Sequence, residues 1–216
     1  MTNMGKYLGI VFDLDGVICS TDEYHYQAWK VLAERIGASG FDRADNARQR
    51  GVSRMESLEV VLEKAPRAYC AEEKQALATW KNEKYRALLA NMSPSDLAPE
   101  VKQTLDALRA RGLKLAIGSS SKNAPFILER IGLDGWFDAV ADGNSITHSK
   151  PDPEVFLLAA KMLGLAPGDC LVVEDAFSGI DAGLAGGFDT AAVGDALRYD
   201  KPTYKLGAFS DLLNIV

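Results

Sequence analysis

The chain has 216 residues, of which 47% are hydrophobic and 25% are charged, which predicts a soluble globular protein with one large domain or with a core and a smaller insert. Its net charge of −6 and the absence of a basic tract argue against nucleic acid as a main partner, while a local group of cations could still bind a phosphorylated small molecule. No stretch approaches the roughly 20 apolar residues of a membrane span, and no signal peptide is recognisable. The three cysteines are odd in number and have no metal-like spacing, which is typical of proteins of the reducing cytoplasm.

An apolar run from Leu8 to Phe12 predicts the first element, a buried strand of a parallel sheet. It ends in two carboxylates, Asp13 and Asp15, followed by Gly16, which lets the backbone turn. Because an unpaired charge beside a core is costly, the pair points to a cation at the end of the strand, where ligands bind in open α/β sheets. The alternative is that both aspartates only cap the next helix or form an Asx turn.

The next stretch, residues 21–92, has helical patterns and no strand signal. Ser20–Glu23 has the spacing of a capping box and predicts a helix that ends near Gly37. A second capping box at Ser53–Glu56 begins another helix, and residues 71–90 form a third. Four residues of the third helix are expected roughly on one side: Leu77, Trp80, Lys84 and Leu88.

From Pro99 onwards, helices and strands alternate. Helices are predicted at 99–112, 124–131, 153–163 and 178–186, with Asp152 as the N-cap of the third, and strands at 113–117, 137–141, 170–173 and 190–193. Repeated βα units imply an α/β fold with a doubly wound parallel sheet. We therefore expect a core domain of residues 1–20 and 93–216, with a helical cap domain of residues 21–92 inserted after the first strand.

Polar side chains follow several of the predicted strands. They are Asp13 and Asp15, Ser119, Lys150 in a loop of the core, and the pair Glu174 and Asp175. Since the carboxyl ends of parallel strands open on one edge of a sheet, we expect these groups to converge. Carboxylates, one ammonium and one hydroxyl suit Mg²⁺ with a phosphate completing its shell, whereas no cysteine or histidine pair suggests zinc.

This group of residues can support phosphoryl transfer. A carboxylate can attack phosphorus to form an aspartyl phosphate, and a divalent cation and a lysine then offset the repulsion between two anions. A second aspartate two residues further on can protonate the leaving oxygen or accept a proton from the incoming hydroxyl. Phosphoryl transfer needs mostly positioning and charge compensation, which these side chains provide.

The same residues resemble the four motifs of the haloacid dehalogenase-like phosphotransferases: Asp13-Leu14-Asp15-Gly16, Ser119, Lys150 and Glu174-Asp175. The resemblance covers essentially the whole chain and implies a Rossmann-like core. As a set, the motifs are highly specific for the superfamily but say little about the substrate.

Residues of the predicted cap narrow the resemblance to one subgroup, the β-phosphoglucomutases. The residues that carry this likeness are Thr21, His25 and Trp29; Gly51, Val52, Ser53, Arg54 and Ser57; and Lys81, Asn82 and Tyr85. The loops Ser119-Ser120-Ser121-Lys122-Asn123 and Lys150-Pro151-Asp152-Pro153 fit the same subgroup, although Ser120 and residues 142–149 look variable.

The resemblance implies a role for each of these residues. Asp13 would be the nucleophile and Asp15 the general acid/base, and one Mg²⁺ would be bound by Asp13, the Asp15 carbonyl, Glu174 and Asp175. Ser119 and Lys150 would hold the transferring phosphoryl group. His25 would couple cap closure to Asp15. The remaining substrate contacts would come from Arg54 with Ser121, Lys122 and Asn123 at the distal phosphate, and from Thr21, Trp29, residues 51–54, Ser57, Lys81 and Ser120 around the sugar.

The implied activity is that of an isomerase that interconverts β-glucose 1-phosphate and glucose 6-phosphate through β-glucose 1,6-bisphosphate, as a cytoplasmic monomer acting on small sugar phosphates. A sugar-phosphate phosphatase with the same nucleophile is the alternative, and a non-catalytic phosphometabolite-binding regulator is a third hypothesis. The regulator would have no need of Asp13, Asp15, Lys150 and Asp175, all of which are present. Purely structural roles stay open for Lys81 and Trp29.

Overall fold

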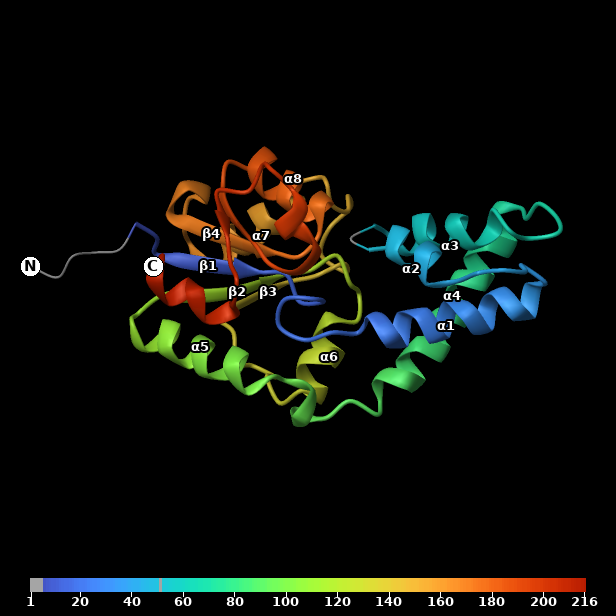
Figure 1. Cartoon of the computed structure of the whole chain (residues 1–216), viewed down its shortest axis with the longest axis horizontal. Coiled ribbons are helices and arrows are strands. Elements are labelled where there is room, and N and C mark those ends of the chain that lie inside the picture. Colours follow the sequence, from blue (N-terminus) through green and yellow to red (C-terminus); the bar gives the residue numbers. More distant parts are fainter. Residues whose placement is uncertain (1–5, 51) are drawn as a thin grey trace, which may run out of the picture. The chain divides into compact units, whose positions relative to one another are not determined.

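The computed structural model describes residues 6–50 and 52–216, which divide into two compact units (Figure 1). The part up to Ser20 together with Ser93–Val216 forms the first, called the sheet unit here, and Thr21–Met92 forms the second, called the helical unit. The chain thus leaves the sheet unit after its first strand and returns to it at Ser93, after the 72 residues of the helical unit.

The sheet unit contains a parallel sheet of six strands in the order β3-β2-β1-β4-β5-β6 among the described residues. The strands are β1 (Gly9–Phe12), β2 (Lys114–Gly118), β3 (Ala139–Ala141), β4 (Cys170–Glu174), β5 (Asp189–Ala192) and β6 (Tyr204–Lys205). This arrangement confirms the predicted fold class, a doubly wound parallel sheet with flanking helices.

Helices cover both faces of this sheet. Figure 1 shows α5 (Pro99–Ala110) and α6 (Ala124–Arg130) on one side and α7 (Glu154–Leu163) and α8 (Phe177–Ala185) on the other. Apolar side chains of α7 pack on β1, β2 and β3, and Phe156 is fully buried in a cluster with Val11, Ala116 and Ala141. Short 3-10 helices complete the unit: Pro94–Asp96, Pro167–Asp169, Gly194–Arg198 and Phe209–Asn214.

Strand β1 lies at the point where the chain reverses its direction of travel across the sheet. Its last residue, Phe12, is in register with Ile117 of β2 and Val173 of β4. The ladder extends one residue further, because the Asp13 N–H donates to the Val173 carbonyl at 2.9 Å. The carboxyl ends of β1, β2 and β4 therefore meet at the switch point, where α/β sheets bind ligands.

The helical unit has its own apolar core. Its helices are α1 (Asp22–Ile36), α2 (Arg43–Arg48), α3 (Arg54–Leu62) and α4 (Ala71–Leu89). Trp29 and Leu32 of α1 pack with Leu58 and Val61 of α3 and with Ala78 of α4. This shared core makes the insert a compact unit.

The beginnings of the helices agree with the sequence in part. The capping box at Ser53 and Glu56 is confirmed. The one predicted at Ser20 and Glu23 is wrong, because α1 begins at Asp22 with Thr21 as its N-cap, and the Thr21 hydroxyl accepts instead from the Tyr85 hydroxyl at 2.8 Å.

One further helix start differs from the prediction. Helix α7 begins at Glu154, one residue later than expected, although the Asp152 carboxylate still accepts from the Glu154 N–H at 3.0 Å. The buried residues of α4 are Ala78, Lys81, Tyr85 and Leu89, whereas Leu77 and Trp80 are partly buried against the same core and Lys84 is exposed. Within the described parts of the chain, no helix combines the length and apolarity needed to cross a membrane.

Candidate active site

The buried ammonium of Lys150 is the centre of the polar group at the strand ends. Its Nζ lies 2.5 Å from Asp13 Oδ1 and 2.7 Å from Glu174 Oε1, and its side chain is only 2% exposed. The three residues come from the end of β1, the end of β4 and the loop between β3 and α7. The strand ends thus converge as the sequence predicted, in an environment where charges interact strongly.

Asp175 lies against the turn that follows Asp13. Gly16 has a φ of +87°, and a Cβ built on it would lie 2.1 Å from Asp175 Oδ2, so any larger residue would collide with that carboxylate. Glycine is needed here both for its backbone conformation and for the close approach. The carboxylate of Glu174, the residue before Asp175, is oriented by a hydrogen bond in which its Oε2 accepts from the Ala176 N–H at 2.8 Å.

The charge of this group is unbalanced. Burial and the nearby carboxylates of Glu174, Asp13 and Asp15 raise the pKa of Asp175 to about 8. Burial also raises the pKa of Asp13 to about 7, against the attraction of Lys150. One ammonium therefore does not neutralise four clustered carboxylates, and the all-oxygen donor set fits a hard divalent cation such as Mg²⁺.

The loop after β2 brings hydroxyl and amide groups to the same edge of the sheet. Ser119 is buried, and its hydroxyl accepts from the Ser121 N–H at 3.2 Å, while the Ser121 hydroxyl accepts from the Asn123 N–H at 3.2 Å. Asn123 is also buried, whereas Lys122 is exposed and Ser120 is partly buried. These successive turns hold residues 119–123 in a defined shape at the carboxyl end of the sheet.

A second loop supports the first, and the sequence did not indicate its importance. The buried Asp142 carboxylate accepts from the Asn144 and Ser145 side chains and from the Asn144 N–H. In turn, the Gly143 N–H donates to the Ser121 carbonyl at 3.2 Å, and Asn144 Nδ2 donates to the Lys122 carbonyl at 3.0 Å. The Asp-Gly-Asn sequence is typical of a turn, but it does not indicate which loop the turn contacts.

In the helical unit, His25, Lys81 and Tyr85 form a second polar group. Lys81 is 2% exposed, and its Nζ lies 2.9 Å from His25 Nδ1 and 4.6 Å from the centre of the Tyr85 ring. Burial, and then the cations of Lys81 and Arg54, hold the pKa of His25 well below its usual value. His25 is therefore neutral near pH 7, and because an ammonium only donates, Nδ1 accepts and Nε2 carries the proton.

Arg54 begins α3 in the same unit. Its guanidinium is half-buried, which lowers its pKa, and no carboxylate among the described residues pairs with it. A partly desolvated cation without a carboxylate partner favours an anionic ligand.

The other expected substrate contacts of the helical unit are distributed around these groups. Val52 and Ser53 are partly buried, Ser57 is buried, and Gly51 lies outside the described residues. Trp29 is 1% exposed in the core of the unit, with Lys81 Nζ 4.2 Å from the centre of its ring. This burial favours the packing role that the sequence left open for Trp29.

Comparison with known proteins identifies relatives for most of the chain. The family model described as haloacid dehalogenase-like hydrolase matches residues 7–187. A β-phosphoglucomutase of Bacillus subtilis (strain 168) is 43% identical over 86% of this chain and 82% of its own length. A fructose-1-phosphate phosphatase of Escherichia coli (strain K12) is 32% identical over 87% of this chain and 97% of its own. The crystal structure of a β-phosphoglucomutase from Clostridium difficile superimposes with a TM-score of 0.88 at 35% identity, covering 95% of this chain and 93% of that one.

Proposed function

Because this chain belongs to the haloacid dehalogenase-like hydrolase family, we propose that its strand-end carboxylates transfer a phosphoryl group and that it is a β-phosphoglucomutase, interconverting β-glucose 1-phosphate and glucose 6-phosphate. The observation that carries the proposal is the ammonium of Lys150 held between Asp13 and Glu174, beside carboxylates that one cation leaves unbalanced. A buried carboxylate with such neighbours is suited to attack phosphorus.

Two observations support a mutase over a phosphatase. The identity to the B. subtilis mutase, 43%, exceeds the 32% to the E. coli phosphatase. In addition, a mutase must bind a sugar with two phosphates, and the Arg54 guanidinium supplies a cation in addition to Lys150. Its planar fork matches the oxygens of the phosphate that does not react, with Ser121, Lys122 and Asn123 as further contacts.

In the proposed cycle, phosphorylated Asp13 donates its phosphoryl group to the 6-hydroxyl of β-glucose 1-phosphate. The bond between phosphorus and the Asp13 oxygen breaks as the bond to the sugar oxygen forms, and Asp15 accepts the hydroxyl proton. The product, β-glucose 1,6-bisphosphate, reorients so that its other phosphate faces Asp13. Return of that phosphate to Asp13, with Asp15 now donating the proton to the sugar oxygen, releases glucose 6-phosphate.

Charge compensation comes from the side chains around Asp13. Lys150 and Ser119 bind the oxygens of the transferring group, and Asp13, the Asp15 carbonyl, Glu174 and Asp175 would bind Mg²⁺. Bound there, Mg²⁺ supplies positive charge that offsets the repulsion between the carboxylate and the phosphate. Lys150 remains protonated throughout, because the carboxylates of Asp13 and Glu174 raise its pKa although burial alone would lower it.

We further propose that the helical unit is a cap that excludes water from the aspartyl phosphate, with His25 linking its closure to Asp15. His25 is suited to this role because Lys81 fixes its tautomer, leaving the Nε2 proton to donate. The protein would act as a cytoplasmic monomer, with no nucleic acid or membrane partner.

Phosphorus NMR of the purified protein tests the proposal. With Mg²⁺, β-glucose 1-phosphate and a trace of β-glucose 1,6-bisphosphate, we expect glucose 6-phosphate to accumulate with little inorganic phosphate. Stoichiometric inorganic phosphate would instead mean that water reaches the aspartyl phosphate, and the phosphatase alternative would replace the mutase. If neither product forms, this sugar is not the substrate.

A further inference from the structure

The loop that carries Lys150 is closed by the side chain of Glu154. Lys150 belongs to neither a strand nor a helix, yet its Nζ is held within 2.7 Å of both Asp13 and Glu174. A long flexible side chain on a loop needs a fixed backbone to reach the same point in every molecule. The contacts of residues 147–154 show what fixes it.

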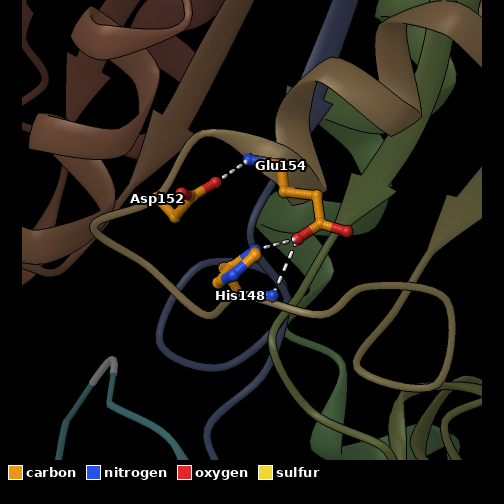
Figure 2. A group of neighbouring side chains, drawn as sticks. All are labelled: His148, Asp152 and Glu154. Atoms are coloured by element: carbon orange, nitrogen blue, oxygen red, sulfur yellow. Dashed lines mark hydrogen bonds and ion pairs between the residues drawn. The ribbon is translucent and has the colours of Figure 1, made fainter.

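Glu154 is the first residue of α7, and its carboxylate turns back onto the beginning of the loop (Figure 2). Its Oε1 accepts from the Thr147 N–H at 2.9 Å, and its Oε2 accepts from the His148 N–H at 2.7 Å. The His148 ring adds a contact from Nδ1 to Oε2 at 3.1 Å. One carboxylate therefore ties residues 147 and 148 to the helix that follows, with Lys150 between them.

The rest of the loop is closed from within. The Asp152 N–H donates to the Ser149 carbonyl at 3.1 Å, forming a turn around Lys150. The Asp152 carboxylate accepts from the Glu154 N–H at 3.0 Å, as Figure 2 shows. The backbone bonds from Thr147 and His148 also lower the pKa of Glu154, so its carboxylate stays ionised across the neutral range.

We propose that Glu154 is a positioning residue that holds the Lys150 ammonium at the Asp13 carboxylate. The inference rests on the proposed function, in which Lys150 neutralises the transferring phosphoryl group. It adds to that function a residue that contacts neither substrate nor Asp13 and acts only through the loop.

A metal site is the competing explanation for the same three side chains. Ligand atoms of His148, Asp152 and Glu154 lie within 4.8 Å of one another. However, the carboxylates of Asp152 and Glu154 already accept backbone N–H groups. Closure of the loop accounts for both carboxylates, whereas a cation would compete with these hydrogen bonds, so we favour the positioning role.

The test compares Glu154→Gln with His148→Ala. An amide has one carbonyl oxygen and turns its NH₂ towards the second N–H donor, so E154Q loses one of the two backbone bonds. H148A removes only the ring contact and leaves both backbone bonds in place. The probe is trifluoroberyllate, a mimic of the transferring phosphoryl group, bound to the Mg²⁺-loaded protein and followed by fluorine NMR.

We expect the dissociation constant of trifluoroberyllate to rise about tenfold in E154Q, as for a weakened charge-assisted contact, and to change less than about twofold in H148A. Binding of glucose 6-phosphate should stay within about twofold of wild type in both variants, because Lys150 is not its distal anchor. A K150A variant provides the reference for complete loss of the ammonium.

An unchanged affinity of E154Q for trifluoroberyllate would overturn the proposal. It would also be overturned if E154Q lost affinity for trifluoroberyllate and for glucose 6-phosphate in parallel and had a lower melting temperature, because that combination indicates general structural damage. Binding of trifluoroberyllate depends on the groups around Asp13 and requires no turnover of a sugar phosphate. A wild-type protein that binds it but produces no glucose 6-phosphate would disprove the mutase proposal and leave the role of Glu154 in place.

Discussion

Replacing Asp13 by Asn removes the proposed nucleophile while keeping the size of the side chain. We expect D13N to lose turnover by about four orders of magnitude or more, since removing a covalent nucleophile leaves only binding and electrostatic assistance. The variant should also show no added phosphate by intact mass spectrometry after incubation with the 1,6-bisphosphate. Because burial raises the pKa of Asp13 to about 7, the uncharged amide should not lower the melting temperature. Substantial remaining turnover would disprove the assignment.

Arg54 tests the second phosphate site. Its guanidinium has no carboxylate partner in the described part of the chain, so R54A removes no internal ion pair and should fold normally. We expect the KM for β-glucose 1-phosphate to rise about tenfold or more, as for loss of a charge-assisted hydrogen bond. R54K, which keeps the charge but not the fork, should be intermediate in steady-state kinetics. An unchanged KM in both variants would refute the assignment.

Several individual residues were predictable and others were not, for a physical reason. Charged residues directly after a buried strand are conspicuous in a sequence because an unpaired charge there is costly. This pattern identified Asp13 and Asp15 as candidate site residues. The helical pattern of α4 did not indicate that Lys81 would be buried, because its burial depends on contacts with His25 and Trp29 of another helix. A buried lysine with tertiary partners has no local signature.

Among the elements, the turn at residues 142–145 is expected to determine the shape of the loop at 119–123. A Cβ at Gly143 would lie 2.3 Å from the Ser120 carbonyl oxygen and 2.9 Å from the Lys122 nitrogen, so G143A must displace that loop. We expect kcat/KM to fall about tenfold to a hundredfold, because small misplacements of binding groups are costly in catalysis. Steady-state kinetics on the same sugar phosphate measures this.

The matched control for that substitution is Gly168→Ala. A Cβ there meets no atom within 4 Å, and its backbone is not in the left-handed region. G168A should therefore keep wild-type kinetics within about twofold and a similar melting temperature. Equal kinetics in G143A and G168A would show that the second loop does not shape the first.

Elements with strong periodicity or caps were predictable, and short ones were not. Helix α2 has six residues and no apolar stripe, and it is held by a capping box at Asp42 and Asp45 that the helical pattern did not reveal. Strand β6 has two residues and exists only because it pairs with β5. The contacts of residues 142–149 were not predicted either, because they join residues whose partners only the tertiary fold brings near.

At the scale of the molecule, the clustered carboxylates predict an unusual pH dependence of stability. The pKa of Asp13 is raised from 3.8 to about 7 and that of Asp175 from 3.8 to about 8, so between about pH 4 and pH 8 the folded protein binds protons that the unfolded chain releases. The free energy of unfolding of the metal-free protein should therefore decrease as pH rises through this window. A loss of about 1–2 kcal/mol would lower the melting temperature by about 2–8 °C for a chain of this size.

Mg²⁺ should reverse this loss, because binding to the folded state alone stabilises it by mass action. Thermal unfolding in EDTA and in Mg²⁺, at pH 5.5 and pH 8, measures both effects, and the stabilisation by Mg²⁺ should be larger at pH 8. D175N removes one carboxylate and should flatten the pH dependence and weaken the effect of Mg²⁺. A metal-free protein that gains stability between pH 5.5 and pH 8 would contradict the prediction.

The insertion of the helical unit after β1 has a consequence for the folding pathway. Strands β1 and β2 are neighbours in the sheet, with Gly9 in register with Lys114, so more than a hundred positions of chain separate two paired residues. Closing so long a loop slows folding, since contacts between distant residues form late. The helical unit has its own core and many local contacts, and we expect it to fold first. Its compaction shortens the loop that must close, so destabilising substitutions at Leu58 or Val61 should slow the pairing of β1 with β2, although neither residue belongs to the sheet.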